Sequence, residues 1–187
     1  MVDFIPNPRA AALGGFMTRY AAAEMEIKLI LSAILDLSIY EFAVVAEPYS
    51  GATLRNVAKS IVKLKLAPDD PMRDKLLQAI GTLYSYSTLR NQIAHAKWAP
   101  GRRPDSIQPL YVQTRSGRAR FVGSNDEDDD YTTEELVNLA NEVKAINNRL
   151  YDLKLEGGYN AIIERNMSRK RYSIEDEGGN SSSDSSC

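Results

Sequence analysis

The chain has 187 residues, of which 43% are hydrophobic and 26% charged, as in an ordinary soluble globular protein. Its net charge of −2 excludes a uniformly basic nucleic-acid-binding protein, so any RNA contact must come from a local patch. Cys187 is the sole cysteine, which excludes an intrachain disulfide framework and a cysteine metal site. The N-terminus does not resemble a secretory signal, and no apolar run reaches about 18 residues, so we expect a cytoplasmic protein without a membrane span.

Two helices are predicted before residue 66. Asn7 and Pro8 suit the start of the first helix, because Asn caps a helix and Pro fits its first position. Helical spacing of apolar residues continues to about Leu37, through Phe16, Met17, Tyr20, Ile27, Ile30, Leu31, Ile34 and Leu35. Residues 38–50 fit either a short strand or the end of a helix. The second helix is expected over 52–65, with an apolar face formed by Leu54, Val57, Ile61 and Leu64.

A third helix is predicted from Pro71 to about Lys97. An acidic cap before Pro71 favours a helix start, and Pro100 prevents a long continuation. The stripe of this helix that faces the core begins apolar and ends polar: Leu76, Ile80, Leu83, Ser87, Arg90, Asn91 and His95. A core face that turns polar favours a cleft or a hydrogen-bonded polar network over a solvated surface.

Residues 99–130 are predicted to be non-helical, with a β-hairpin at about 106–123. Alternating residues over 110–115 and 118–122 flank the turn residues Ser116 and Gly117. Between Arg90 and Arg120 seven basic residues stand against one acidic residue, a local charge of +6. Excluding Arg90, we expect these basic residues to bind nucleic acid: Lys97, Arg102, Arg103, Arg115, Arg118 and Arg120. The acidic run 125–130 that follows is interpreted as a solvated loop.

A fourth helix is predicted from Thr132 to Gly157. Thr132 and Glu135 match a capping box, and the buried face is expected to contain Leu136, Leu139, Val143, Ile146 and Leu150. A short helix fits Tyr159–Asn166. The remaining 168–187 are too polar to bury a core and are expected to form a disordered tail. The pattern therefore predicts a mainly α protein with a single helical-bundle domain over 1–167.

The segment Leu89–Trp98 contains the only His and the only Trp of the chain. In it Arg90 is followed directly by Asn91 and, five positions on, by His95. This spacing, at a helix end before a Pro-Gly break, resembles the R-N-x3-H signature of the HEPN superfamily (higher eukaryotes and prokaryotes nucleotide-binding). The resemblance covers roughly residues 10–155. It implies an up-and-down bundle of four to five helices, with the hairpin after the motif helix.

Many HEPN domains are metal-independent ribonucleases or toxins of toxin–antitoxin pairs, so the resemblance implies an endoribonuclease without cofactor. His95 would act as acid or base, and the planar fork of Arg90 would stabilise the phosphoryl oxygens. Asn91, one turn before His95, would orient the imidazole or contact the ribose. One His does not easily serve as both acid and base, so the family pairs two motifs in a homodimer. On an ideal helix, however, Arg90 and His95 point about 140° apart.

The chain departs from the family at one position. Some HEPN toxins carry a Tyr two residues after the His, which a partner nucleotidyltransferase adenylylates. Here that position is Lys97, so silencing by this route is not expected. The sequence does not identify an antitoxin or any other protein partner. It also offers no His, Cys and carboxylate set for a metal ion.

Two other functions fit the same residues. The first is a non-catalytic nucleotide- or RNA-binding module that uses the same cleft without turnover. The second is a structural protein–protein interaction protein, in which the charge of His95 suits the C-terminal end of a helix dipole. Arg90 would then form an ordinary salt bridge, and the basic hairpin and acidic tail would meet a protein partner.

Overall fold

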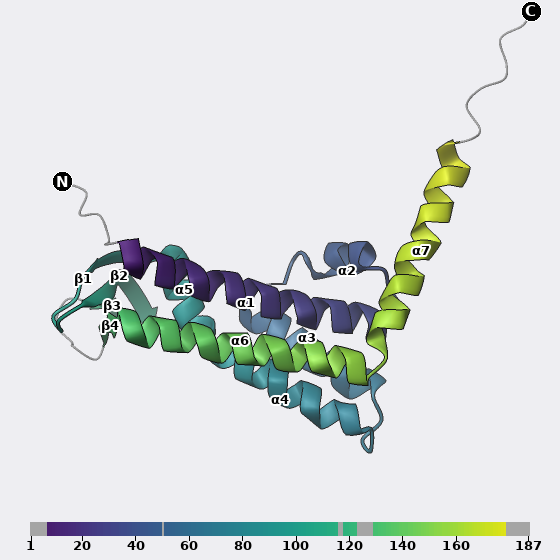
Figure 1. Ribbon diagram of the computed structural model, residues 1–187, viewed down its shortest axis with the longest axis horizontal. Helices are drawn as coiled ribbons and strands as arrows, with labels where there is room; N and C mark the ends of the chain where they lie inside the picture. The colour runs from purple at the N-terminus through teal and green to yellow at the C-terminus, as the bar shows by residue number, and fades with distance from the viewer. Residues whose placement is uncertain (1–6, 50, 116–117, 123–128, 179–187) are drawn as a thin grey trace, which may run out of the picture. The chain divides into compact units, whose positions relative to one another are not determined.

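The computed structural model describes residues 7–49, 51–115, 118–122 and 129–178. These residues form, in order, α1 (Asn7–Ile34), α2 (Ile39–Ala46), α3 (Gly51–Lys65), α4 (Pro71–Ser85), α5 (Ser87–His95), β1 (Lys97–Pro100), β2 (Ser106–Arg115), β3 (Arg118–Val122), β4 (Tyr131–Thr132), α6 (Thr133–Glu156) and α7 (Tyr159–Gly178) (Figure 1). The prediction of a mainly α protein with a β-hairpin after the motif helix is confirmed.

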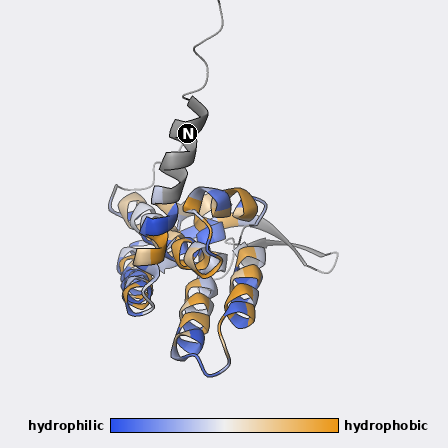
Figure 2. Ribbon diagram, turned by 90° about the vertical axis from the view of Figure 1, so that its right-hand side faces the viewer, coloured by the Kyte–Doolittle hydropathy of each residue, from blue (hydrophilic) through white to orange (hydrophobic). Residues whose placement is uncertain are grey.

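Contacts divide the chain into two compact units. The first comprises Met1–Glu24 and Gly81–Arg149, and the second comprises Met25–Ile80 and Leu150–Cys187. Helices α1, α4 and α6 contribute residues to both units. Most helices carry both hydrophilic and hydrophobic residues, as Figure 2 shows, which is the pattern of helices that bury one face. A single domain over 1–167 stays a prediction.

The first unit is built around a small antiparallel sheet. Strand β2 pairs with β1, β3 and β4, and the four strands gather near the start of α1 and of α6 (Figure 1). Ile107 of β2 is 1% exposed and packs in one cluster with Ala12, Leu13 and Leu136. Ile93, Trp98 and Tyr131 pack against this cluster. The sheet thereby connects α1, α5 and α6.

Two strands were not anticipated from the sequence. Strands β1 and β4 have only four and two residues, too few for an alternating pattern to be recognised. Both form by pairing with β2, with Trp98 opposite Pro109 and Tyr131 opposite Ile107. The predicted hairpin has the expected register, with Val112 opposite Phe121.

The prediction of one helix from Pro71 to Lys97 is wrong, because the helix breaks at Tyr86. Tyr86 has φ −85° and ψ 1°, and α5 starts at the next residue. Its ring lies 6.4 Å from the ring of Phe16, and its hydroxyl donates to Glu142 at 2.7 Å. Just before the break, the Ser85 hydroxyl donates to the carbonyl of Thr82, a contact that bends helices. Packing of Tyr86 therefore overrides the local helical preference.

In the second unit, the segment that fitted either a strand or a helix end forms the helix α2 over residues 39–46, and residue 50 lies outside the described residues. Ser38 caps α2 in a capping box: its hydroxyl accepts from the Glu41 N–H at 3.2 Å, and Glu41 accepts from the Ser38 N–H at 2.8 Å. Among the described side chains of α3, Leu54, Ala58 and Val62 are buried. The predicted face was misplaced at its end, since Leu64 is 81% exposed.

Polar contacts hold the last helices of the second unit. Lys154 of α6 is buried and pairs with Glu26 at 2.7 Å. Asp36 has a positive φ of 56° just after α1, and its carboxylate accepts from Arg165 and Asn166 of α7. Helix α7 continues to Gly178, beyond the end predicted near Asn166. Of the predicted tail, 179–187 lie outside the described residues.

Among the described residues, no single helix is long and apolar enough to cross a membrane. The pair Pro8–Ile34 and Ile39–Ala46 has the required length and composition only when taken together, and it is bent by 110°.

We expect Ser38→Ala to lower the free energy of unfolding by about 1 kcal/mol, because it removes the cap of α2. The matched control is Ser60→Ala, which lies exposed on α3 and should change stability by less than about 0.5 kcal/mol. Urea unfolding of both variants measures the difference. Equal stability of the two variants would contradict the capping role.

Candidate functional site

Helix α5 carries the three residues of the motif. It has nine residues, of which Leu89 is buried, and it ends at His95. Ala96 is extended, with φ −78° and ψ 152°, and leads into β1. The helix thus stays regular through the motif, and the chain turns only after His95.

Arg90 is the first residue of the motif on α5. Its side chain is half-buried, and Nη1 donates to Oδ1 of Asn91 at 3.2 Å. Its positive charge also acts on Tyr20 of α1. Burial and the nearby Glu24 raise the pKa of the Tyr20 hydroxyl, and Arg90 partly opposes this rise. The guanidinium is therefore hydrogen-bonded to Asn91 and close enough to Tyr20 for its charge to act there.

Asn91 and His95 are both exposed. Because they are four positions apart on a regular helix, they lie one turn apart on the same side. The expected cleft at the end of a long core stripe is therefore not found at these two residues. The break at Tyr86 changes the phase of the helix, so the stripe of Leu76, Ile80 and Leu83 does not continue into α5. The Arg90 side chain is hydrogen-bonded to that of Asn91, while the helical geometry keeps Arg90 and His95 about 140° apart.

The residues predicted to bind nucleic acid fall into three groups. Lys97 and Arg102 are exposed on and just after β1. Arg103 is half-buried and donates two hydrogen bonds to Glu135, so its charge is paired. The hairpin arginines are described by backbone alone: Arg115 pairs with Arg118, and Arg120 pairs with Gln113.

Asp130 corrects the interpretation of 125–130 as a solvated loop. It is 3% exposed, and its Oδ2 accepts hydrogen bonds from the N–H groups of Arg102 and Arg103 and from the Ser106 hydroxyl. Burial tends to raise the pKa of Asp130, but these hydrogen bonds lower it below the usual value. Residues 125–128 lie outside the described residues.

Gly101 is required beside this carboxylate. A Cβ atom at this position would lie 2.6 Å from Oδ2 of Asp130 and would also meet the Ser106 hydroxyl. The turn between β1 and β2 can therefore close on Asp130 only because residue 101 has no side chain.

Glu135 links the same turn to α6. Its carboxylate accepts hydrogen bonds from both terminal nitrogens of Arg103, at 2.9 and 2.7 Å, and from the N–H of Thr132 at 2.7 Å. The Thr132 hydroxyl in turn accepts the Glu135 N–H at 3.1 Å, which confirms the predicted capping box. The hydrogen bonds from Arg103 and Thr132 lower the pKa of Glu135 from 4.5 to about 2.

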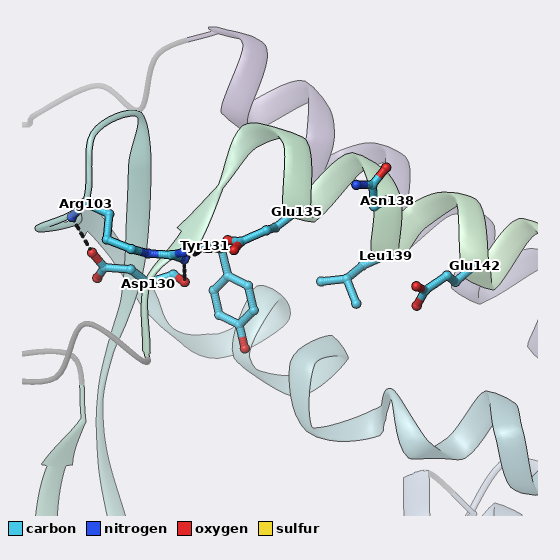
Figure 3. Close-up of a pocket in the computed structure, with 7 residues that line it drawn as sticks. All are labelled: Arg103, Asp130, Tyr131, Glu135, Asn138, Leu139 and Glu142. Carbon is cyan, nitrogen blue, oxygen red and sulfur yellow. Dashed lines mark hydrogen bonds and ion pairs between the residues drawn. The ribbon is translucent and has the colours of Figure 1, made fainter.

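An open groove of about 530 Å³, which we call the α6 groove, lies in the first unit. It is lined by Arg103, Asp130, Tyr131, Glu135, Asn138, Leu139 and Glu142 (Figure 3). The Tyr131 hydroxyl reaches Gln92 of α5 at 3.4 Å, and Gln92 donates to the Tyr111 hydroxyl at 3.0 Å. At the other end Tyr86 donates to Glu142, and burial together with this hydrogen bond raises the pKa of Tyr86 to about 12.

Sequence reasoning missed this groove, although a signal was present. Glu135, Asn138, Leu139 and Glu142 follow the i, i+3, i+4, i+7 spacing of a single helix face. From the sequence, Leu139 was predicted as a core residue and Glu135 as part of a capping box, and the polar positions 138 and 142 between them and beyond were assigned no role. A face of mixed polarity beside a buried face indicates a groove.

The described residues contain no group of three or more His, Cys, Asp or Glu side chains placed to hold a metal ion. No protein-family model, curated protein or solved structure matches the chain. The relation to the HEPN superfamily therefore stays a prediction, and it rests on the motif and on the helical fold.

The lowered pKa of Glu135 predicts a pH dependence of stability. A carboxyl group with a lowered pKa in the folded state stabilises the protein above its unfolded pKa, and this contribution disappears as the pH falls from 4.5 towards about 2. Glu135→Gln should therefore melt below the parent at pH 7, and the two curves should converge on acidification. Thermal unfolding across this pH range measures the effect.

The control for this prediction is the partner residue. In an Arg103→Gln background the Glu135→Gln change should matter much less, because the paired charge is already gone. A gap between parent and Glu135→Gln that stays constant from neutral to acidic pH would contradict the assignment.

Proposed function

We propose that the chain is a metal-independent RNA endonuclease or toxin of the HEPN type in the cytoplasm. The observation that carries the proposal is the placement of His95 and Asn91 on one exposed side at the end of α5, with Arg90 bonded to Asn91. Lys97 and Arg102 add positive charge on the adjoining segment. An exposed imidazole with exposed cations nearby in the chain is accessible to the phosphodiester backbone of RNA.

The chemistry needs only groups that the chain possesses. A base removes the proton of the ribose 2′-hydroxyl, the 2′-oxygen forms a bond to phosphorus, and the bond to the 5′-oxygen breaks. An acid then gives a proton to the departing 5′-oxygen, which leaves a 2′,3′-cyclic phosphate and a 5′-hydroxyl. Imidazole is suited to both proton transfers near neutral pH, and a guanidinium stabilises the crowded phosphoryl oxygens.

A second copy of the chain completes the site in this proposal. One chain supplies one imidazole, and the helix directs Arg90 away from His95. Two copies that face each other through α5 would place two His95 side chains, one acid and one base, at a shared phosphate. The exposure of Asn91 and His95 is compatible with such a contact.

A binding module without turnover is the second candidate. It is favoured by the separation of Arg90 from His95 within one chain, since both residues can contact phosphate independently without a shared reacting group. The third candidate, an interaction protein, requires only that the exposed basic residues meet an acidic partner. An antitoxin is one such partner under the toxin proposal.

The first test of the proposal is His95→Ala. Cleavage of RNA by the parent should survive EDTA and give 2′,3′-cyclic phosphate ends, and the variant should be slower by a factor of about 10²–10⁴. Arg90→Lys should also be impaired, because a point charge does not replace a planar fork. Because His95 is the only His, its imidazole proton signals in NMR are directly assignable and report RNA binding in the parent.

The matched control is Gln108→Ala, a half-buried polar residue of β2 that the proposal does not use. If parent and His95→Ala bind RNA equally and neither turns it over, the chain is a binding module. If neither binds RNA, the interaction protein remains.

The second test is the oligomeric state. Light scattering coupled to size-exclusion chromatography should give about twice the chain mass of 20.8 kDa. His95→Asp should shift the protein towards the monomer if the two α5 helices face each other, because it places like charges close together. A parent that is monomeric at concentrations where it cleaves RNA would contradict the composite site.

A further inference from the structure

We propose that the α6 groove binds an arginine or lysine side chain presented by a protein partner. The groove belongs to the first unit, and the proposed RNA chemistry at His95 makes no use of it. The proposal rests on the charge, the shape and the apolar content of its lining.

The charge of the lining favours a cation. Its ionisable residues include three carboxylates and one guanidinium, and that guanidinium is bonded to Glu135. Asp130 directs its Oδ2 to the turn between β1 and β2. Glu142 is exposed, lines the groove and accepts a hydrogen bond from the Tyr86 hydroxyl. A carboxylate has about four acceptor positions, so this hydrogen bond leaves room for a ligand. A basic group at Glu142 would form a charge-assisted hydrogen bond.

The apolar part of the lining suits a long basic side chain. Leu139 and Tyr131 are half-buried, and Figure 3 shows Leu139 and Glu142 extending from α6 on the side where the Tyr131 ring lies. Lys and Arg bury their alkyl stems along such surfaces while the charged end stays near water. A guanidinium also stacks favourably on an aromatic face. Leu139 and Tyr131 would cover the stem, and Glu142 would receive the charged end.

The same features exclude other ligands from the proposal. Phosphate groups of RNA would be repelled by the carboxylates, so the groove is not an extension of the RNA surface. The groove is open, and an open site favours a side chain held by a larger partner over a small molecule that must be enclosed. A protein with an exposed basic residue between apolar neighbours has the required chemistry.

Glu142→Gln is the variant that tests the charge. Gln keeps an oxygen that accepts the Tyr86 hydroxyl, so the fold should be preserved while the negative charge is lost. The matched control is Glu134→Gln, which is exposed on the same helix and does not line the groove. Equal melting temperatures of both variants and the parent verify that the comparison concerns binding.

The probes are a capped pentapeptide, Ala-Leu-Arg-Leu-Ala, and its twin with citrulline in place of arginine, which has the same shape without the charge. Trp98 is the only Trp of the protein, and its ring lies 6.1 Å from Tyr131, so its fluorescence reports occupancy of the groove. We expect the arginine peptide to saturate below about 1 mM. The citrulline peptide, and the Glu142→Gln variant with the arginine peptide, should bind about fivefold more weakly.

Several results would overturn the proposal. They are the absence of saturable binding, equal binding of the citrulline peptide, or equal weakening by Glu134→Gln. Agmatine, a free alkylguanidine, is the third probe, and binding as tight as that of the peptide would assign the groove to a small amine instead of a protein. His95→Ala should bind the arginine peptide like the parent, so a failure of the RNA proposal leaves this test intact.

Discussion

The buried carboxylate of Asp130 is the interaction on which the first unit most depends. It accepts hydrogen bonds from the backbone N–H groups of Arg102 and Arg103 and from the hydroxyl of Ser106. It thereby closes the turn between β1 and β2 and places β4 beside β2. Through Arg103 and Glu135 the same network fixes the start of α6. Tyr131, the residue after Asp130, extends these contacts to α5, because its hydroxyl reaches Gln92 at 3.4 Å.

The break at Tyr86 separates two roles that a continuous helix would have combined. Helix α4 supplies buried residues such as Leu83, whereas α5 exposes Asn91 and His95. Tyr86 itself contacts both α1, through Phe16, and α6, through Glu142. The motif therefore stands on a short helix whose direction is set by long-range contacts, while the surface it presents is polar.

Much of the fold could be predicted from residue spacing and caps. The Thr132 and Glu135 box, the α1 and α3 helices and the register of the hairpin follow from local patterns that act within a few residues. The break at Tyr86 and the burial of Asp130, which escaped prediction, depend on contacts distant in sequence. The helix breaks at Tyr86, whose side chain contacts Phe16 and Glu142. Asp130 is buried against a turn nearly thirty positions earlier. No window of sequence contains both partners of such contacts.

The same limit applies to the candidate site. The spacing of Arg90, Asn91 and His95 identified a polar surface on α5 but could not place it in a cleft or outside one. The local charge also led us to expect that Arg103 binds nucleic acid, although Arg103 forms an ion pair with Glu135. The residues of α6 that line the groove could be recognised from their spacing as one helix face. The groove itself could not be recognised, because it is also lined by Tyr131 of β4.

The close approach at Gly101 has an evolutionary consequence. Since any side chain there would collide with Asp130 and Ser106, the three positions must change together or remain unchanged. Homologues that keep this fold should retain a Gly, Ser and Asp triplet at these relative positions even if the residues on α5 diverge. Such a triplet offers a criterion of common ancestry that is independent of the Arg, Asn and His spacing, and it would distinguish descent from chance similarity of a short motif.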